Sequence, residues 1–152
     1  MTDNRIKLLQ NTPIFGGIRE DTLKLLLEKC ADLEVKKGGY FFEENDDAAS
    51  MFVLEDGVVS VIKHWNDTPV ILHQLKSGDC FGEIALMEMM PRSASIRADE
   101  RCQAIELPRS ALFALYQADL EQFALIQMNM GREICRRLRD ADARLFEAQH
   151  GK

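Results

Sequence analysis

The chain has 152 residues, 46% of them hydrophobic, which suits one globular domain with a substantial core. Its formal net charge is −6 at pH 7, so the chain would repel a phosphate backbone, and we expect no direct nucleic-acid binding. No apolar stretch approaches the ~20 residues of a membrane span, and the first ten residues lack the apolar run of a signal peptide. We therefore expect a cytoplasmic protein with no membrane contact.

The N-terminal part of the chain is predicted to be helical. Residues 5–10 can form a short helix that stops before Pro13. A second helix is expected over residues 19–30, where leucines recur at spacings of three and four.

Residues 32–107 have a different pattern, in which short β-rich runs alternate with Gly, Asn and Asp. The expected strands cover residues 32–35, 40–42, 50–54, 58–63, 70–75, 95–98 and 102–107. Strands this short at this spacing are typical of a sandwich or barrel and not of βαβ units.

After Pro108 the pattern is helical to near the end of the chain. An apolar stripe repeats there at alternating spacings of four and three, which is a heptad-like pattern. Its members are Leu120, Ala124, Gln127, Gly131, Ile134, Leu138, Ala141 and Leu145. The stripe has two interpretations, packing against the barrel of the same chain or a helix-to-helix seam of a homodimer.

One segment, residues 78–95, breaks the strand pattern and contains the candidate chemistry. Gly82 allows a close backbone approach, and the helix-forming residues after it predict a short helix whose first N–H groups attract an anion. Arg92 follows the helix-stopping Pro91, and arginine is the natural bidentate partner of a phosphate. Ser93 adds a hydroxyl donor beside it.

Glu83 conflicts with a simple anion site, because two negative charges repel each other. The conflict disappears if the ligand has a hydroxyl beside its phosphate, since an ionised carboxylate accepts hydrogen bonds. A 3′,5′-cyclic nucleotide offers one phosphate charge and one free 2′-OH. Taken alone, Glu83 and Arg92 favour a simpler interpretation, two solvated side chains or a surface ion pair worth at most about 1 kcal/mol.

The full string FGEIALMEMMPRSASIRA, residues 81–98, resembles the phosphate-binding cassette of the cyclic-nucleotide-binding domain family. That family includes catabolite activator protein, protein kinase A regulatory subunits and cyclic-nucleotide-gated channels. The resemblance extends to the turn residues Gly38, Gly57 and Gly78 and to the helical part after Pro108.

The resemblance implies a mainly β, α+β fold, an antiparallel β jelly-roll barrel with a short phosphate-binding helix. Residues 1–152 would form a single domain with N-terminal helices (1–31), a β-roll (32–107) and C-terminal helices (108–152), the last of them long.

The resemblance also implies site residues. Glu83 would accept a hydrogen bond from the ribose 2′-OH, and Arg92 would bind the exocyclic phosphate oxygens. Backbone N–H groups would come from Gly82, Ile84, Ala85 and Ser93. The apolar wall under the purine would consist of Val61, Ile62 and Ile96, and Arg132 or Arg136 of the C-terminal helix would reach the base.

Three positions depart from the family pattern. Asn45 stands where many members have Gly, and Asn is the next best residue for a left-handed turn. Met87–Met90 is unusually rich in methionine, which indicates either an adaptable apolar cover or core filling. Ser93 is intermediate between the Ala of many cAMP binders and the Thr of many cGMP binders, so cAMP is the preferred ligand and cGMP stays open.

The expected function is a regulatory sensor that signals through movement of the C-terminal helix to a protein effector or a second protomer. Too few residues follow Leu138 for a helix-turn-helix unit, His64, His73 and His150 are scattered, and the four cysteines form no zinc-ligand pattern. We therefore expect no enzyme activity, metal or cofactor, and reduced cysteines. The alternatives are a ligand-free interaction module that keeps the fold, or a regulatory fragment of a longer transcription regulator or channel.

Overall fold

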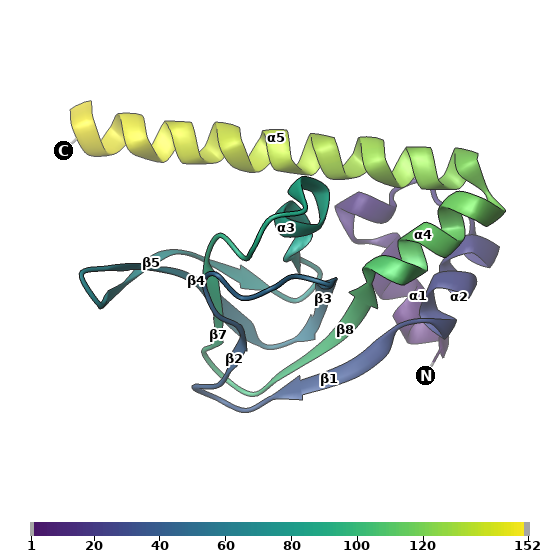
Figure 1. The fold of residues 1–152 in the computed structure, drawn as a ribbon, viewed down its shortest axis with the longest axis horizontal. Coiled ribbons are helices and arrows are strands. Elements are labelled where there is room, and N and C mark those ends of the chain that lie inside the picture. The colour runs from purple at the N-terminus through teal and green to yellow at the C-terminus, as the bar shows by residue number, and fades with distance from the viewer. Residues whose placement is uncertain (1, 151–152) are drawn as a thin grey trace.

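The computed structural model describes residues 2–150 as two antiparallel sheets of four strands each, flanked by helices (Figure 1). This arrangement confirms the expected jelly-roll fold. In chain order the elements are α1 (Thr2–Gln10), the 3-10 turn η1 (Pro13–Phe15), α2 (Glu20–Glu28), β1 (Ala31–Val35), β2 (Tyr40–Phe42), β3 (Ser50–Asp56), β4 (Val58–Trp65), β5 (Thr68–Lys76), β6 (Cys80–Phe81), α3 (Glu83–Glu88), β7 (Ser95–Ala98), β8 (Cys102–Pro108), α4 (Arg109–Ala118) and α5 (Leu120–His150).

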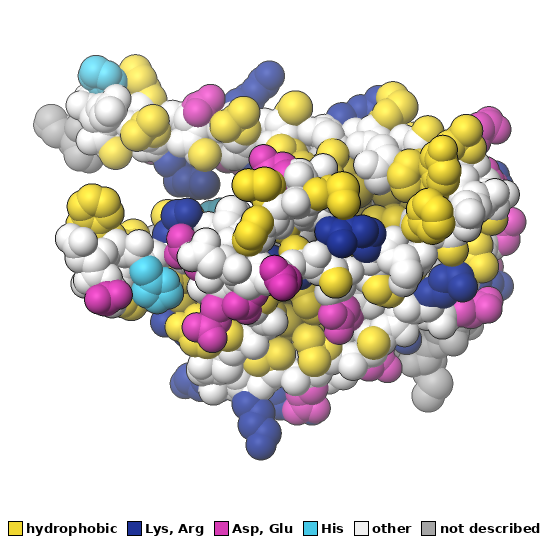
Figure 2. Space-filling model, viewed as in Figure 1, with side chains coloured by type: hydrophobic (Ala, Val, Ile, Leu, Met, Phe, Trp, Pro, Cys, Tyr) yellow, Lys and Arg dark blue, Asp and Glu magenta, His cyan; other side chains and the backbone are white. Residues whose placement is uncertain are grey.

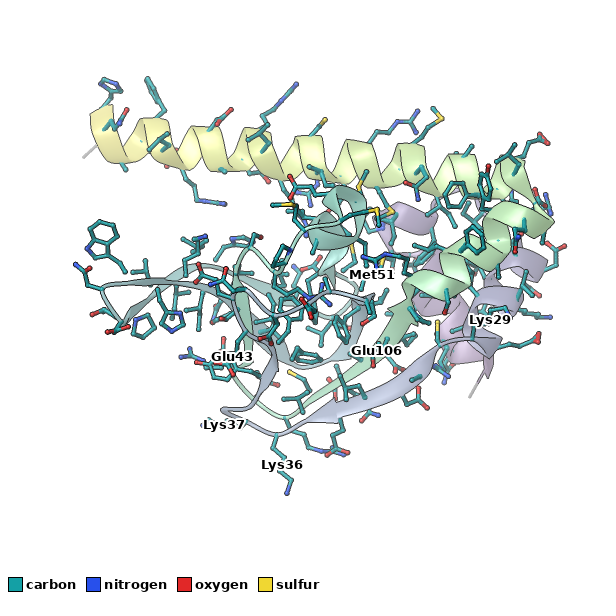
Figure 3. The ribbon with its side chains drawn as sticks, in the orientation of Figure 1. Lys29, Lys36, Lys37, Glu43, Met51 and Glu106 are labelled. Carbon is teal, nitrogen blue, oxygen red and sulfur yellow. The ribbon has the colours of Figure 1, made fainter. Side chains whose placement is uncertain are left out.

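The first sheet, in the order β1-β8-β3-β6, is covered on both faces. Side chains alternate along β3, so Met51 and Val53 pack against the helices while Phe52 and Leu54 pack against the second sheet. Met51 lies on the side of this sheet that faces the helices, whereas Lys36 and Lys37 project from the far end of the barrel (Figure 3). The uninterrupted apolar run of β3 is thus explained by burial on both faces.

The second sheet has the order β2-β7-β4-β5 and places β5 at an edge. Between the two sheets lies an apolar cluster that includes Phe52, Phe81 and Ile96. This cluster lies beneath residues 78–95, the segment that contains the candidate chemistry.

The long helix α5 lies across the helical end of the molecule and then continues past the barrel (Figure 1). Its buried residues are Gln122, Ile126, Asn129, Met130 and Glu133. The predicted stripe from Leu120 to Leu145 lies elsewhere on the helix, and none of its eight members is buried. The interpretation of that stripe as packing against the same chain's barrel is therefore wrong.

The four cysteines are all free thiols, as expected. Cys80 and Cys102 are buried, Cys30 is half-buried and Cys135 is exposed. Within residues 2–150, no helix combines the length and apolar character needed to cross a membrane.

Candidate functional site

A cavity of about 150 Å³ lies where α3 meets the second sheet and α5. All six residues predicted to bind the ligand line it, together with Val61 and Ile96 of the predicted apolar wall. The complete lining is Phe42, Val61, His73, Leu75, Phe81, Gly82, Glu83, Ile84, Ala85, Arg92, Ser93, Ala94, Ile96 and Arg137. The structure thus brings together segment residues that are up to 13 positions apart with residues from β2, β4, β5, β7 and α5.

Gly82 is the residue before α3, and its backbone is left-handed with φ of +85°. A Cβ atom at this position would lie 2.8 Å from Nη1 of Arg92 and 3.4 Å from the ring of Phe42. Only glycine lets the chain turn into α3 while the guanidinium group packs against it.

Arg92 is held at both its backbone and its side chain. Its N–H donates to the carbonyl of Asp46 at 2.9 Å, and its carbonyl accepts from the N–H of Asn45 at 2.8 Å. Asn45 has the left-handed φ of +75° that the sequence predicted for it. From the side chain, Nη1 donates to the Gly82 carbonyl at 2.9 Å and Nη2 to the Ser50 carbonyl at 2.6 Å.

Arg92 is 4% exposed, and its guanidinium group lies over the ring of Phe42, with 4.0 Å from Cζ to the ring centroid. Burial lowers its pKa, although arginine stays protonated at any physiological pH. Its Nε is buried and has no hydrogen-bond partner among the described residues. The site therefore holds a buried positive charge with an unused donor.

Glu83 is 1% exposed and is the first residue of α3. Its Oε1 accepts a hydrogen bond from Nη1 of Arg137 at 2.9 Å. Its Oε2 is buried and has no partner in the described part of the chain. The carboxylate thus has one satisfied oxygen and one oxygen that can still accept.

Arg137 connects α5 to the site. Besides Glu83, it donates from Nη2 to the carbonyl of Cys80 at 2.7 Å and from Nε to Glu133 at 3.0 Å. Burial lowers the pKa of Arg137, but the carboxylates of Glu83 and Glu133 outweigh it and raise that pKa overall. Arg137 is therefore a fixed cation shared by two buried carboxylates.

The structure places three predicted residues outside the cavity lining. Ile62 is fully buried but lies elsewhere in the core. Arg136 pairs with Glu133 and Asp140, and Arg132 donates to Asn129. The α5 arginine that enters the cavity is Arg137, which lies four residues after Glu133.

The sequence contained one signal for Arg137. Ile126, Met130, Glu133 and Arg137 follow each other at spacings of four, three and four, and therefore share one helix face. This face contains charged residues, so the apolar repeat of the helix does not reveal it.

A second hollow of about 400 Å³ adjoins the cavity and shares His73, Leu75 and Arg137 with it. Lys76, Arg136 and Arg144 add positive charge, which Asp79 and Asp140 partly balance. Burial lowers the pKa of His73, and the charges of Arg144 and Arg137 lower it further. A ligand too large for the first cavity can thus continue between β5 and α5.

Comparison with known proteins gives the family context of this geometry. Residues 32–119 match the sequence model of a family described as the cyclic nucleotide-binding domain. The potassium/sodium hyperpolarization-activated cyclic nucleotide-gated channel 2 of Homo sapiens is 31% identical over 101 residues, which are 66% of this chain and 11% of the channel. The cAMP-dependent protein kinase type II regulatory subunit of Drosophila melanogaster is 30% identical over 92 residues, which are 60% of this chain and 24% of that subunit. The chain thus spans only a small part of these relatives.

Solved structures agree on the fold. A cyclic nucleotide-binding domain from Methylobacillus flagellatus superposes with a TM-score of 0.87 at 20% identity, covering 99% of this chain and 85% of its own, which shows the fold alone. The catabolite activator protein of Thermus thermophilus gives a TM-score of 0.77 at 27% identity, covering 91% of this chain and 63% of its own. A PfPKA-R structure described as cAMP bound gives 0.68 at 25% identity, covering 74% of this chain and 40% of its own.

The buried carboxylate of Glu83 has a testable consequence for stability. Burial raises its pKa above the ordinary value of 4.5, although Arg137 opposes the change. The native state therefore loses stability as the pH rises from 4.5 through the raised pKa. The total loss is about 1.4 kcal/mol for each unit by which folding raises the pKa of Glu83. We expect Glu83→Gln to unfold at higher denaturant than the wild type at pH 7, with the advantage vanishing below pH 4.5.

Urea unfolding of both proteins between pH 4 and pH 8 measures this difference. Glu34→Gln is a suitable control, because the exposed Glu34 pairs with Arg101 and its pKa is lowered. A Glu83→Gln variant that is less stable than the wild type by the same amount at every pH would show that the bond to Arg137 outweighs the cost of burial.

Proposed function

The chain belongs to the cyclic nucleotide-binding domain family, and we propose that it binds a 3′,5′-cyclic nucleotide, with cAMP preferred over cGMP, as a regulatory sensor rather than an enzyme. The observation that carries this proposal is the pair of buried side chains in one cavity, each with an unused polar atom. Arg92 offers Nε as a donor, and Glu83 offers Oε2 as an acceptor.

The phosphate would lie at the Arg92 side of the cavity. The guanidinium group supplies a full charge from an environment with few competing waters, since an aromatic ring covers one of its faces. The Ser93 hydroxyl and the first N–H groups of α3, at Gly82, Ile84 and Ala85, would add neutral donors. A singly charged cyclic phosphate matches this single buried cation.

The ribose would lie at the Glu83 side. A 2′-OH donates one hydrogen bond, and the Oε2 atom of Glu83 can accept one without breaking the bond between Oε1 and Arg137. The purine would extend over Val61 and Ile96 toward the adjoining hollow between β5 and α5. This pose accounts for a first cavity that is too small for a whole nucleotide.

The signal would leave through α5. Arg137 is bonded to the carboxylate that the ribose would contact, so a ligand changes the free energy of the bond that holds the helix. The PfPKA-R structure described as cAMP bound and the relative named as a cAMP-dependent protein kinase regulatory subunit support cAMP as the ligand. The downstream effector would respond to the resulting position of α5.

We expect Arg92→Ala to weaken cAMP binding by about 2–5 kcal/mol, because the phosphate would be left in a buried site without its counter-charge. Isothermal titration calorimetry with cAMP and with cGMP measures the loss and the preference between the two. Arg101→Ala is the matched control, since Arg101 is an exposed arginine on the barrel.

Arg92 also bonds two backbone carbonyls, so Arg92→Lys should accompany the alanine variant, with circular dichroism to confirm that both fold. Absence of heat from the wild type at millimolar cAMP and cGMP would overturn the sensor proposal and favour the ligand-free interaction module.

The role of Glu83 can be tested with 2′-deoxy-cAMP. The wild type should bind it about tenfold more weakly than cAMP, because the deoxy compound leaves a buried carboxylate oxygen unsatisfied. In Glu83→Ala the two ligands should bind about equally. The ratio in the two proteins forms a double-mutant cycle, and a ratio that Glu83→Ala leaves unchanged would place the ribose elsewhere.

We also propose that the exposed stripe of α5 is the seam of a homodimer. Leu120, Leu138 and Leu145 are each 58–60% exposed and recur along one helix face. Exposed leucines in such a repeat are typical of a helix that packs against a second helix.

Light scattering should therefore show a dimer that Leu138→Glu converts to a monomer. Ile71→Glu introduces the same charge at an exposed apolar position on β5 and should leave the dimer intact. A wild type that is monomeric at high concentration, with and without cAMP, would remove the seam.

A further inference from the structure

A separate hollow of about 390 Å³ lies between the end of α3, α4 and α5. It shares no lining residue with the candidate nucleotide cavity. Its volume falls within the range of about 300–1,000 Å³ that is usual for small-molecule sites. The hollow is therefore a second candidate site for a small molecule.

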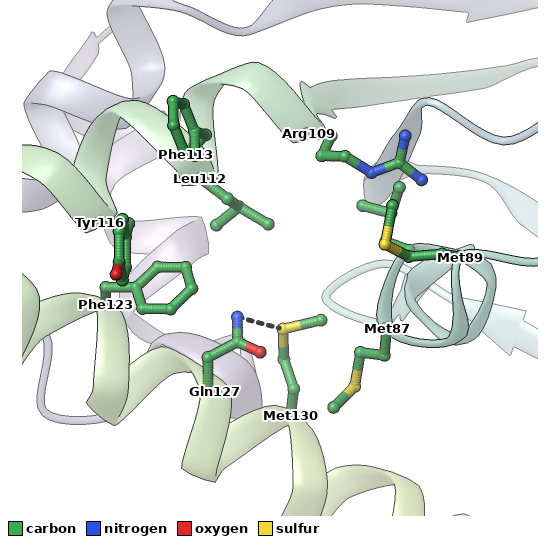
Figure 4. A pocket seen from close by; sticks show the side chains of 10 residues that line it. Met87, Met89, Arg109, Leu112, Phe113, Tyr116, Phe123, Gln127 and Met130 are labelled. Carbon is green, nitrogen blue, oxygen red and sulfur yellow. Dashed lines mark hydrogen bonds between the residues drawn. The ribbon is translucent and has the colours of Figure 1, made fainter.

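Two facing walls of the hollow are built from different apolar side chains (Figure 4). Phe113, Tyr116 and Phe123 form an aromatic wall, with ring centroids 6.1 Å apart for Phe113 and Tyr116 and 5.3 Å apart for Tyr116 and Phe123. Met87 and Met89 lie across from them (Figure 4). Flexible thioethers opposite rigid rings suit an apolar ligand whose shape is not fixed.

The rim of the hollow is exposed to an extent that core packing does not explain. Met89 is 74% exposed, Phe113 58% and Tyr116 49%. The interpretation of Met87–Met90 as core filling is therefore wrong for the three methionines of that run. Figure 2 shows apolar side chains gathered over α3 and α4 on this face of the molecule.

Polar groups with unused hydrogen-bonding capacity lie at two points in this apolar surface. Arg109 is the single charged residue of the described lining, and its Nη2 donates to the carbonyl of Ala48 at 3.0 Å. Its Nε is buried without a partner among the described residues. Gln127 has an amide that donates only to the sulfur of Met130, at 3.8 Å, which is a weak acceptor. Figure 4 shows the Arg109 guanidinium at the edge of the hollow, beside Met89.

Met89 has a left-handed backbone with φ of +57°, at the position after α3 where glycine is the usual residue. A methionine there is strained, because its Cβ lies close to the following carbonyl oxygen. With this backbone conformation the Met89 side chain lies at the edge of the hollow.

We propose that this hollow binds an amphiphile that has one apolar chain and one carboxylate. The apolar chain lies between the aromatic wall and the methionines, and the carboxylate pairs with Arg109. A single guanidinium group in an otherwise uncharged lining favours a ligand with one carboxylate, because the two charges are complementary. The site is independent of nucleotide binding, so either can fail without the other.

Calorimetry with decanoate and with 1-decanol, both below the concentration at which they aggregate, tests the proposal. Decanoate should bind at one site per chain and about tenfold more tightly than decanol, because only decanoate pairs with Arg109. Arg109→Gln should remove that difference, and Arg109→Lys should keep most of it. Leu72→Ser, which alters an exposed leucine on β5 that lines none of these hollows, should change neither affinity.

Met89→Gly separates a ligand role from a structural role. It should raise the melting temperature, because glycine relieves the left-handed backbone, and it should weaken both probes several-fold. The proposal would be overturned if decanoate gives no saturable heat, if Arg109→Gln keeps the preference for decanoate, or if cAMP displaces decanoate from the wild type. The first result would leave the hollow as a surface for a protein partner.

Discussion

The carboxylate of Glu83 is buried to 1% exposure, deeper than any other described charged side chain of the fold. An ion that leaves water costs several kcal/mol unless a partner is at hand. The side chain that meets this requirement, Arg137, comes from α5, 54 positions further along the chain. One ion pair therefore links the start of α3 to the long C-terminal helix.

Upstream of Arg137, α5 is attached to the N-terminal segment by apolar packing of Ile126 and Met130 and by polar bonds. Gln122 accepts from the N–H of Arg19 at 2.9 Å, and Asn129 donates to the carbonyls of Ile14 at 3.1 Å and Gly16 at 2.9 Å. Beyond Arg137, residues 138–150 are all exposed. Arg137 is thus the last attachment of α5 to the described body of the chain, and a change there is carried to the full remaining length of the helix (Figure 1).

Residues 81–98 and the helix α5 differ in how much of their role could be predicted from the sequence. The strands were predictable because β-rich runs and turn residues are local features, and residues 81–98 were predictable as a site because their order is specific. The buried face of α5 was not, since Gln122, Asn129 and Glu133 are polar residues that bury themselves by bonding distant groups. Periodicity selects the most apolar face of a helix, and here that face is the exposed one. Successive residues of a helix are rotated by about 100° around its axis, so Arg132, Arg136 and Arg137 point in different directions. Hydrophobicity alone assigned the wrong helix face, and therefore the wrong arginines, to the site.

The short helix α3 connects these observations, because its two ends are bounded by left-handed residues of different kinds. At Gly82 the conformation is obligatory, since any Cβ would meet Arg92. At Met89 a side chain is accommodated at a cost in strain and lies over the second hollow. The helix is thus fixed at its start by two buried charges, Arg92 and Glu83, and has adaptable apolar residues at its end. The two hollows share no lining residue, and α3 and α5 each contribute different side chains to both, so the two helices separate the sites while helping to build each of them.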